Sequence, residues 1–196
     1  MLHRAFLASL LFIPGALAAQ HDLAGRSLAR TPPAEARQFD FLVGQWEVAA
    51  RPRVSALAAR LHGAPRYTGT WRAWRSLDGW GIEDELRLLD DAANPRSFSH
   101  SVRVYDPAAK HWNGSTLDVY RATFSSHSAE WRTGEMLVSS RGTDQEGRRF
   151  VARTRYYDIT PASFKFQQDL SYDDGRTWVE GVLRIDAKRS AASSSR

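Results

Sequence analysis

Apolar and polar residues alternate with a period of two along most of the chain, and this pattern predicts β-strands. Nine segments carry the pattern, and a short tenth strand is indicated near Ala122–Phe124. The nine are Phe41–Ala50, Tyr67–Ser76, Gly81–Leu89, Ser97–Tyr105, Trp112–Tyr120, Glu130–Ser140, Arg149–Ile159, Ser163–Ser171 and Trp178–Asp186. Turn-forming pairs such as Asp78-Gly79, Asp106-Pro107 and Thr160-Pro161 separate them. The chain is therefore expected to be all-β, with short connections.

The number of these strands indicates whether the sheet is open or closed. Long strands leave exposed edges unless the sheet closes on itself. We therefore predict an up-and-down barrel of 8–10 antiparallel strands, with a two-sheet sandwich as the alternative. One segment breaks the alternation: Val54, Leu57 and Leu61 fall on one helical face, and Gly63 follows as a stop signal. This pattern fits a short helix between the first two strands, over one barrel end, and equally a surface loop.

The two ends of the chain differ in composition from the middle. Residues 1–19 resemble a signal peptide, with Arg4, an apolar run from Ala5 to Ile13 and small residues up to Ala19. That run is too short for a permanent membrane span, which needs about 20 residues. Residues 20–37 form a polar linker, residues 38–187 the barrel domain, and residues 188–196 a low-complexity, disordered tail. We expect an exported protein, periplasmic or secreted, without a membrane segment in the mature chain.

Composition narrows the chemistry. The chain has no cysteine, which excludes disulfides, thiolate catalysis and thiolate metal sites. The net charge of +5 is carried mainly by arginines that are scattered singly, whereas a nucleic-acid binder concentrates its charge in a stripe. The histidines show no metal-ligand spacing, and the usual catalytic motifs are missing. Nucleic acid, metal and cofactor are therefore not predicted, and the sequence leaves the oligomeric state open.

The first predicted strand carries a familiar motif. The segment from Phe39 to Val48 reads FDFLVGQWEV, and its Gly44-x-Trp46 resembles the opening motif of lipocalins and their calycin relatives. It is more similar still to uncharacterised exported bacterial domains of the lipocalin-like superfamily, which also carry a segment like Ser163–Trp178. The resemblance implies a barrel with an internal pocket, but no single function, because the superfamily includes carriers, haem proteins and a few enzymes. It also implies that an arginine of the final strand, here Arg184, covers the Trp46 indole.

Two other likenesses carry less weight. Ser171, Asp173, Gly175 and Trp178 fit the Asp-box of sialidase-type propellers, in which the motif stiffens a hairpin and repeats from blade to blade. It occurs once here, so we expect a stiff hairpin with a structural role. The chain is also similar to nitrobindin-like haem barrels, in which a histidine near the C-terminus holds the iron. No histidine follows His127, so haem is not predicted.

Alternation also suggests which residues line the interior. Asp84, His100 and Gln168 each lie on an otherwise apolar strand face, so we expect them to point inward. The hypothesis is that they line a pocket together with Trp71, Tyr156 and Phe166. Asp84 and His100 would then be diagonal neighbours about 7–8 Å apart. Such a pair is either a satisfied internal hydrogen bond or a group that orients a ligand or transfers protons.

Three functions remain open on the sequence alone. The first is a non-catalytic exported barrel that binds a small, mostly apolar molecule. The second is an enzyme that uses His100 and Asp84 for acid–base chemistry in the same cavity. The third is a structural domain whose interior is filled by its seven tryptophans and nine phenylalanines. A cavity in the interior would separate the third from the other two.

Overall fold

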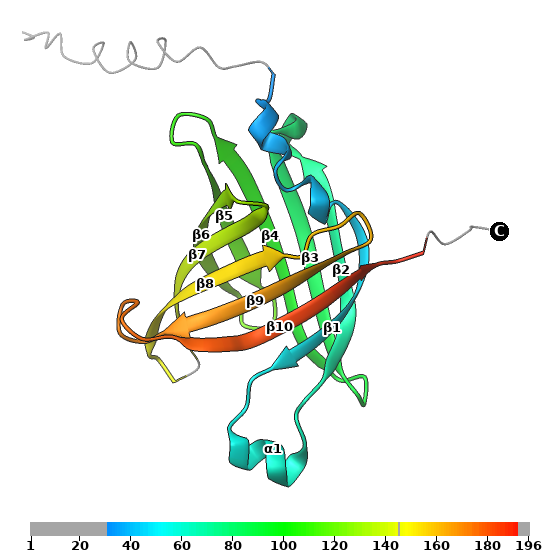
Figure 1. The fold of residues 1–196 in the computed structure, drawn as a ribbon, viewed down its shortest axis with the longest axis vertical. Coiled ribbons are helices and arrows are strands. Elements are labelled where there is room, and N and C mark those ends of the chain that lie inside the picture. The colour runs from blue at the N-terminus through cyan, green and yellow to red at the C-terminus, as the bar shows by residue number, and fades with distance from the viewer. Residues whose placement is uncertain (1–30, 145, 192–196) are drawn as a thin grey trace, which may run out of the picture. The chain divides into compact units, whose positions relative to one another are not determined.

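The computed structural model describes residues 31–144 and 146–191, and most of them form one closed antiparallel barrel (Figure 1). Each of the ten strands pairs with the next along the chain, and the first pairs with the last. The strands are β1 Gly44–Pro52, β2 Tyr67–Ser76, β3 Gly81–Asp90, β4 Pro95–Asp106, β5 His111–Asp118, β6 Thr123–Arg132, β7 Glu135–Thr143, β8 Arg149–Tyr157, β9 Ser163–Ser171 and β10 Val179–Arg189. The predicted all-β barrel is confirmed, and the sandwich is excluded.

One predicted strand is in fact two. The segment Glu130–Ser140 is divided between β6 and β7, which are joined by Thr133 and Gly134. Both residues have positive φ angles, 51° and 84°. Two successive residues of this kind form the tight hairpin turn whose twist matches that of the flanking strands. The short strand expected near Ala122 is the beginning of β6.

The helix between β1 and β2 forms, but it does not cover the barrel. Helix α1, Ala56–His62, starts at Ser55, whose hydroxyl accepts a hydrogen bond from the Ala58 amide at 3.1 Å. Leu57 and Leu61 remain 69% and 68% exposed, and α1 projects from the end of the barrel (Figure 1). Of the helices in the described ranges, none is long and apolar enough to cross a membrane.

The predicted linker and tail are both more ordered than expected at their inner ends. Ala34–Arg37 and Asp40–Leu42 form two short 3-10 helices, here named together the plug, Ala34–Leu42. The prediction of a linker is therefore wrong for residues 34–37, and β1 begins at Gly44 rather than Phe41. Lys188 and Arg189, which were predicted to belong to the tail, are the last residues of strand β10. The predicted signal peptide, residues 20–30 of the linker and residues 192–196 of the tail lie outside the described residues.

The plug closes one end of the barrel with aromatic packing. Trp46 is fully buried, and its indole N–H donates to the Leu42 carbonyl at 2.8 Å. The ring of Phe39 meets Trp112 edge to face at 5.0 Å, and the Trp112 indole N–H donates to the Gln38 side chain at 3.1 Å. Burial of these large rings contributes much of the stability of the fold.

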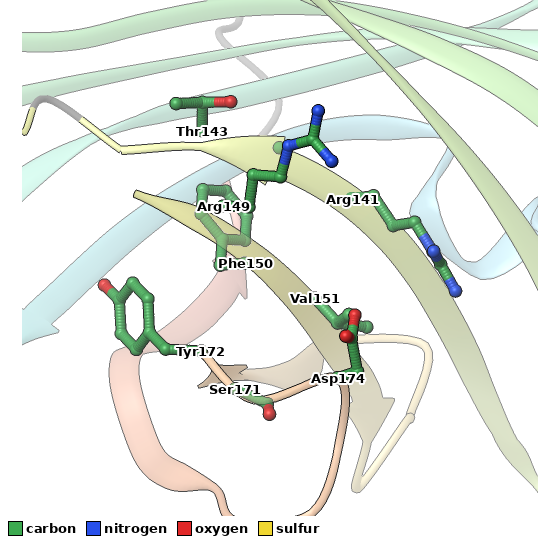
Figure 2. A pocket seen from close by; sticks show the side chains of 9 residues that line it. Arg141, Thr143, Arg149, Phe150, Val151, Ser171, Tyr172 and Asp174 are labelled. Atoms are coloured by element: carbon green, nitrogen blue, oxygen red, sulfur yellow. The ribbon is translucent and has the colours of Figure 1, made fainter. Parts of the chain in front are cut away.

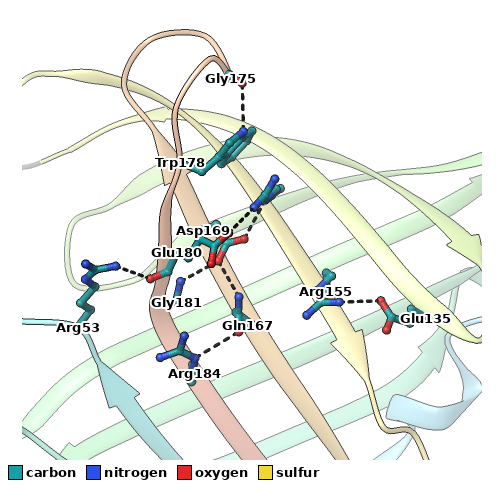
Figure 3. Close-up of polar contacts among 11 residues, drawn as sticks. Arg53, Glu135, Arg155, Gln167, Asp169, Gly175, Trp178, Glu180, Gly181 and Arg184 are labelled. Atoms are coloured by element: carbon teal, nitrogen blue, oxygen red, sulfur yellow. Dashed lines mark hydrogen bonds and ion pairs between the residues drawn. The ribbon is translucent and has the colours of Figure 1, made fainter.

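An arginine covers Trp46, but it is Arg189 rather than the predicted Arg184. The Arg189 guanidinium lies 4.1 Å from the centre of the indole ring. The strand register explains the difference, because Arg189 pairs with Trp46 across β1 and β10, whereas Arg184 pairs with Arg51. Arg184 instead donates to the side chain of Gln167 on the outside of the barrel, at 3.2 Å (Figure 3).

Strand β10 is irregular near its start, and Asp169 holds it in place. The register of β10 against β9 shifts between Val179 and Leu183. The Asp169 carboxylate accepts hydrogen bonds from the Gly181 amide at 2.7 Å, from Arg153 at 2.8 Å and from Gln167 at 2.9 Å (Figure 3). Although burial opposes the charged form, these bonds hold the pKa of Asp169 below its ordinary value.

Candidate functional site

The interior contains a cavity of about 230 Å³ on the far side of the aromatic packing from the plug. The lining comes from nine of the ten strands: Trp71, Asp84, Leu86, Ser97, Ser99, Ser101, Arg103, Thr116, Ser125, His127, Val138, Ser140, Thr154, Tyr156, Phe166, Gln168 and Leu183. The interior of the barrel is therefore not completely filled by its own side chains.

One part of the lining is aromatic. We name Trp71, Tyr156 and Phe166 the aromatic wall. Their ring centres lie 5.2–5.7 Å apart, with tilted or edge-to-face contacts. Trp71 is 3% exposed and Tyr156 is 3% exposed, so packing fixes both rings. The wall is a preformed surface against which a flat or apolar group can pack.

Another part of the lining is rich in hydroxyl groups. We name this set the hydroxyl wall: Ser97, Ser99, Ser101, Thr116, Ser125 and Ser140, from strands β4 to β7. Register places Ser101, Thr116 and Ser125 side by side, and the hydroxyls of the first two are 2.9 Å apart. Ser97 and Ser99 point inward and yet are partly exposed, so solvent reaches the cavity from the end opposite the plug.

A buried ion pair lies between the cavity and the plug. The Asp84 carboxylate, 2% exposed, accepts a hydrogen bond from the Trp71 indole at 2.8 Å and forms an ion pair with Arg103. Arg103 is 5% exposed, and its guanidinium lies 5.1 Å from the centre of the Phe39 ring. Burial works against the charge of Arg103, but the Asp84 carboxylate outweighs it and raises the Arg103 pKa. In this ion pair the Asp84 carboxylate compensates the charge of the Arg103 guanidinium.

The other titratable groups of the cavity are neutral. Burial, helped by the nearby charge of Arg103, lowers the pKa of His127 to about 3, so its imidazole is uncharged near neutral pH. Burial likewise raises the pKa of the Tyr156 hydroxyl, which keeps its proton. The cavity therefore offers hydrogen bonds and aromatic surface, without an uncompensated charge.

Five of the six residues predicted to bind a ligand line this cavity. They are Trp71, Asp84, Tyr156, Phe166 and Gln168. His100 is the exception, because it lies on the outer surface between Glu83 and Glu85, with side-chain N–O distances of 3.3 and 3.7 Å. The predicted placement of His100 beside Asp84 is therefore wrong, and so is the acid–base pair built on it.

The error concerns which side of strand β4 faces the interior of the barrel. Asp84 pairs with Ser101 across β3 and β4, whereas His100 pairs with Glu85, so His100 faces outward together with Phe98, Val102 and Val104. The outer side of β4 is thus the apolar one. Val102 and Val104 are 36% and 38% exposed, and the guanidinium of Arg87 covers the Phe98 ring at 3.9 Å.

Arg103 and His127 also line the cavity, but neither was predicted from the sequence. A signal for the first was present, because Ser97, Ser99, Ser101 and Arg103 alternate along β4 and mark a continuous polar face. The predicted burial of Asp84 also required a cationic partner. His127 had no comparable signal, since it lies in a segment of mixed serines for which only a short strand was indicated.

The Asp-box residues form a hairpin rather than part of the cavity. The Ser171 hydroxyl accepts from the Gly175 amide at 2.8 Å, and the Asp173 carboxylate accepts from the Thr177 amide at 2.8 Å. The Trp178 indole donates to the Gly175 carbonyl at 3.1 Å (Figure 3). Hydrogen bonds from the Thr177 side chain and amide are the main cause that lowers the pKa of Asp173 to about 2.

A second pocket, of about 420 Å³, adjoins this hairpin (Figure 2). Arg141 and Arg149 at the ends of β7 and β8 border it, with Tyr172 and Asp174 from the hairpin. It is larger than the interior cavity, but its arginines are exposed and it lies on the outer surface of the barrel. The interior cavity is the better candidate, because aromatic and polar side chains from nine strands converge on it, as they do in sites where small molecules usually bind.

No protein-family model and no curated protein sequence matches the chain. Among solved structures, Rv2717c from M. tuberculosis is similar with a TM-score of 0.55 and 7% identity, over 82% of this chain and 100% of that one. The S-type phycobiliprotein lyase CPES from Guillardia theta is similar with a TM-score of 0.54 and 12% identity, over 81% and 96% of the two chains. At such low identities these likenesses show the fold alone, that of a lipocalin-like barrel.

Proposed function

We propose that this protein binds a compact, neutral, amphipathic molecule inside its barrel. The observation that carries the proposal is the composition of one cavity, in which an aromatic wall and a hydroxyl wall are both present. An apolar or aromatic part of a ligand packs on Trp71, Tyr156 and Phe166. Its polar groups exchange hydrogen bonds with the serine and threonine hydroxyls.

The charge of the ligand follows from the charges around it. Asp84 and Arg103 neutralise each other, and His127 is uncharged near neutral pH. A charged ligand would lose its hydration without gaining an ionic partner, which is costly in a buried site. A neutral molecule avoids this cost.

The size of the cavity sets the size of the molecule. The volume of about 230 Å³ is below the usual range for drug-sized ligands, roughly 300–1,000 Å³, so the ligand is compact. The hydroxyl wall refines the expectation from the sequence of a mostly apolar ligand, since a purely apolar molecule would exchange no hydrogen bonds with these hydroxyls.

Native mass spectrometry tests the proposal on protein purified from its natural host. The wild-type protein is expected to carry a small molecule of defined mass. Ser99→Phe, which fills the cavity, should lose it, whereas Ser128→Phe, on the exposed side of β6, should retain it. Retention of the same molecule by Ser99→Phe would contradict binding in the interior, and circular dichroism checks that both variants are folded.

A further inference from the structure

Two polar nitrogen atoms at the inner end of the cavity have no hydrogen-bond partner among the described residues. They are the Arg103 Nε and the His127 Nε2, and both atoms are buried. Both residues line the cavity. Buried polar atoms are nearly always paired, so two unpaired atoms at one place indicate where a partner binds.

The surrounding strands are built to hold the imidazole there. Register places Gly114 of β5 between Arg103 of β4 and His127 of β6. The His127 Nε2 occupies the space that a side chain at Gly114 would take, and a Cβ at that position would also lie 2.8 Å from the backbone oxygen of Val102. A glycine is therefore required for His127 to lie over β5, close enough to Arg103 for the arginine charge to depress its pKa.

The chemistry of the two atoms defines the group that satisfies both. The Arg103 Nε carries a hydrogen and only donates, whereas the His127 Nε2 donates or accepts, according to its tautomer. A carbonyl oxygen accepts from both nitrogens. A hydroxyl oxygen accepts from Arg103 and donates to His127. An ammonium group cannot accept a hydrogen bond from Arg103, and the Arg103 charge repels it.

We propose that Arg103 and His127 bind a carbonyl or hydroxyl oxygen of the ligand at the inner end of the cavity. The inference rests on the proposed function and deepens it, by assigning to the ligand one oxygen next to an aromatic or apolar body on Trp71 and Phe166. The ligand class is then a neutral, oxygen-bearing aromatic or cyclic molecule.

Three probes with one phenyl body test the assignment. Ethylbenzene has no oxygen, acetophenone has an accepting carbonyl, and 1-phenylethanol has a hydroxyl. Their dissociation constants are measured by NMR titration of the purified wild-type protein, with the indole N–H of Trp71 and the ¹⁵N-labelled imidazole of His127 as reporters. We expect both oxygenated probes to bind about tenfold tighter than ethylbenzene, in line with one to two buried hydrogen bonds.

The His127→Leu variant removes one of the two nitrogens, and His100→Leu is the matched control on the outer surface of the barrel. We expect the preference for oxygenated probes to fall to about twofold or less in His127→Leu, and to remain in His100→Leu. If His127→Leu does not fold, a shift of the His127 Nε2 resonance in the wild-type protein on adding acetophenone, but not on adding ethylbenzene, supports the proposal in its place.

The outcomes separate this inference from the proposed function. If all three probes bind equally well, the inference is overturned while the proposed function stands, and water alone satisfies the two nitrogens. If His127→Leu keeps the full preference, the assignment to His127 is overturned. If none of the probes binds and the protein from its natural host carries no molecule, both the inference and the proposed function are wrong.

Discussion

The two ends of the barrel interior are built from the same strands and yet differ in kind. At the plug, the buried indole groups of Trp46 and Trp112 donate to definite partners and the aromatic rings pack closely. At the cavity end, inward-facing serines are partly exposed, and one buried nitrogen each of Arg103 and His127 has no hydrogen-bond partner in the described part of the chain. The comparison indicates that one end supplies stability, and the other is the end at which we propose that a ligand binds. Local rules of packing and pairing are broken where a protein binds something.

Replacement of Trp46 by alanine should have the largest effect. The indole is fully buried, packs 4.8 Å from Phe164 and hydrogen-bonds to Leu42. We expect the free energy of unfolding to fall by about 4–5 kcal/mol, measured by urea denaturation. Ser99→Ala at the cavity end should change it by less than about 0.5 kcal/mol. If Trp46→Ala and Ser99→Ala reduced the free energy of unfolding by similar amounts, the proposed difference between the two ends would be wrong.

Asp84→Asn probes the border between the two ends. It leaves the buried Arg103 without its counter-charge, while the amide oxygen still accepts from Trp71. We expect a loss of about 3 kcal/mol in the free energy of unfolding. The double variant Asp84→Asn, Arg103→Met should recover part of it, because no uncompensated charge remains. A double variant less stable than the single one would show that the pair contributes more than charge balance.

Asp169, which is only 4% exposed although it lies on the outward side of β9, offers a smaller, pH-dependent effect. Its folded pKa lies below the unfolded value of about 3.9, so its stabilising effect is present above pH 4 and is lost as the pH falls through the folded pKa. Asp169→Asn should cost about 1–2 kcal/mol at pH 6, and the difference from wild type should shrink towards pH 3. Urea unfolding between pH 6 and pH 3 measures both. The control is Asp158→Asn, in an exposed pair with Lys165, expected to cost less than about 0.5 kcal/mol.

The fold was predictable because alternation alone specifies many strands, and ten strands without exposed edges require closure. The strand limits of Tyr67–Ser76 and Ser163–Ser171 agree with the prediction. The plug was not predictable by the same means. Its residues follow neither the period of a strand nor that of a long helix. Ala36, Phe39 and Leu42 are buried only because they pack against the end of the barrel. Burial that depends on packing between distant segments cannot be predicted from a local sequence pattern.

The candidate site shows a different limit. Alternation in β4 correctly separates Phe98 and His100 from Ser99 and Ser101, but it does not say which side faces the interior. The usual assumption is that the apolar side of a strand faces the interior. It fails for β4, because the part of the interior next to this strand is polar. Trp71, Tyr156 and Phe166 were found because their strands follow the usual assumption. The hydroxyl wall, Arg103 and His127 were missed because the strands that carry them turn polar residues toward the interior.

The plug has a kinetic consequence. With one end stopped by Ala34–Leu42, the barrel is a cup rather than a tube, and any occupant leaves by the route through which it arrived. A ligand would then enter and leave through the same open end of the barrel. Leu183 pairs with Pro52 at this end, shortly before α1 begins. A molecule that covered this open end would therefore slow both the binding and the release of a ligand, without changing the contacts between the ligand and the cavity.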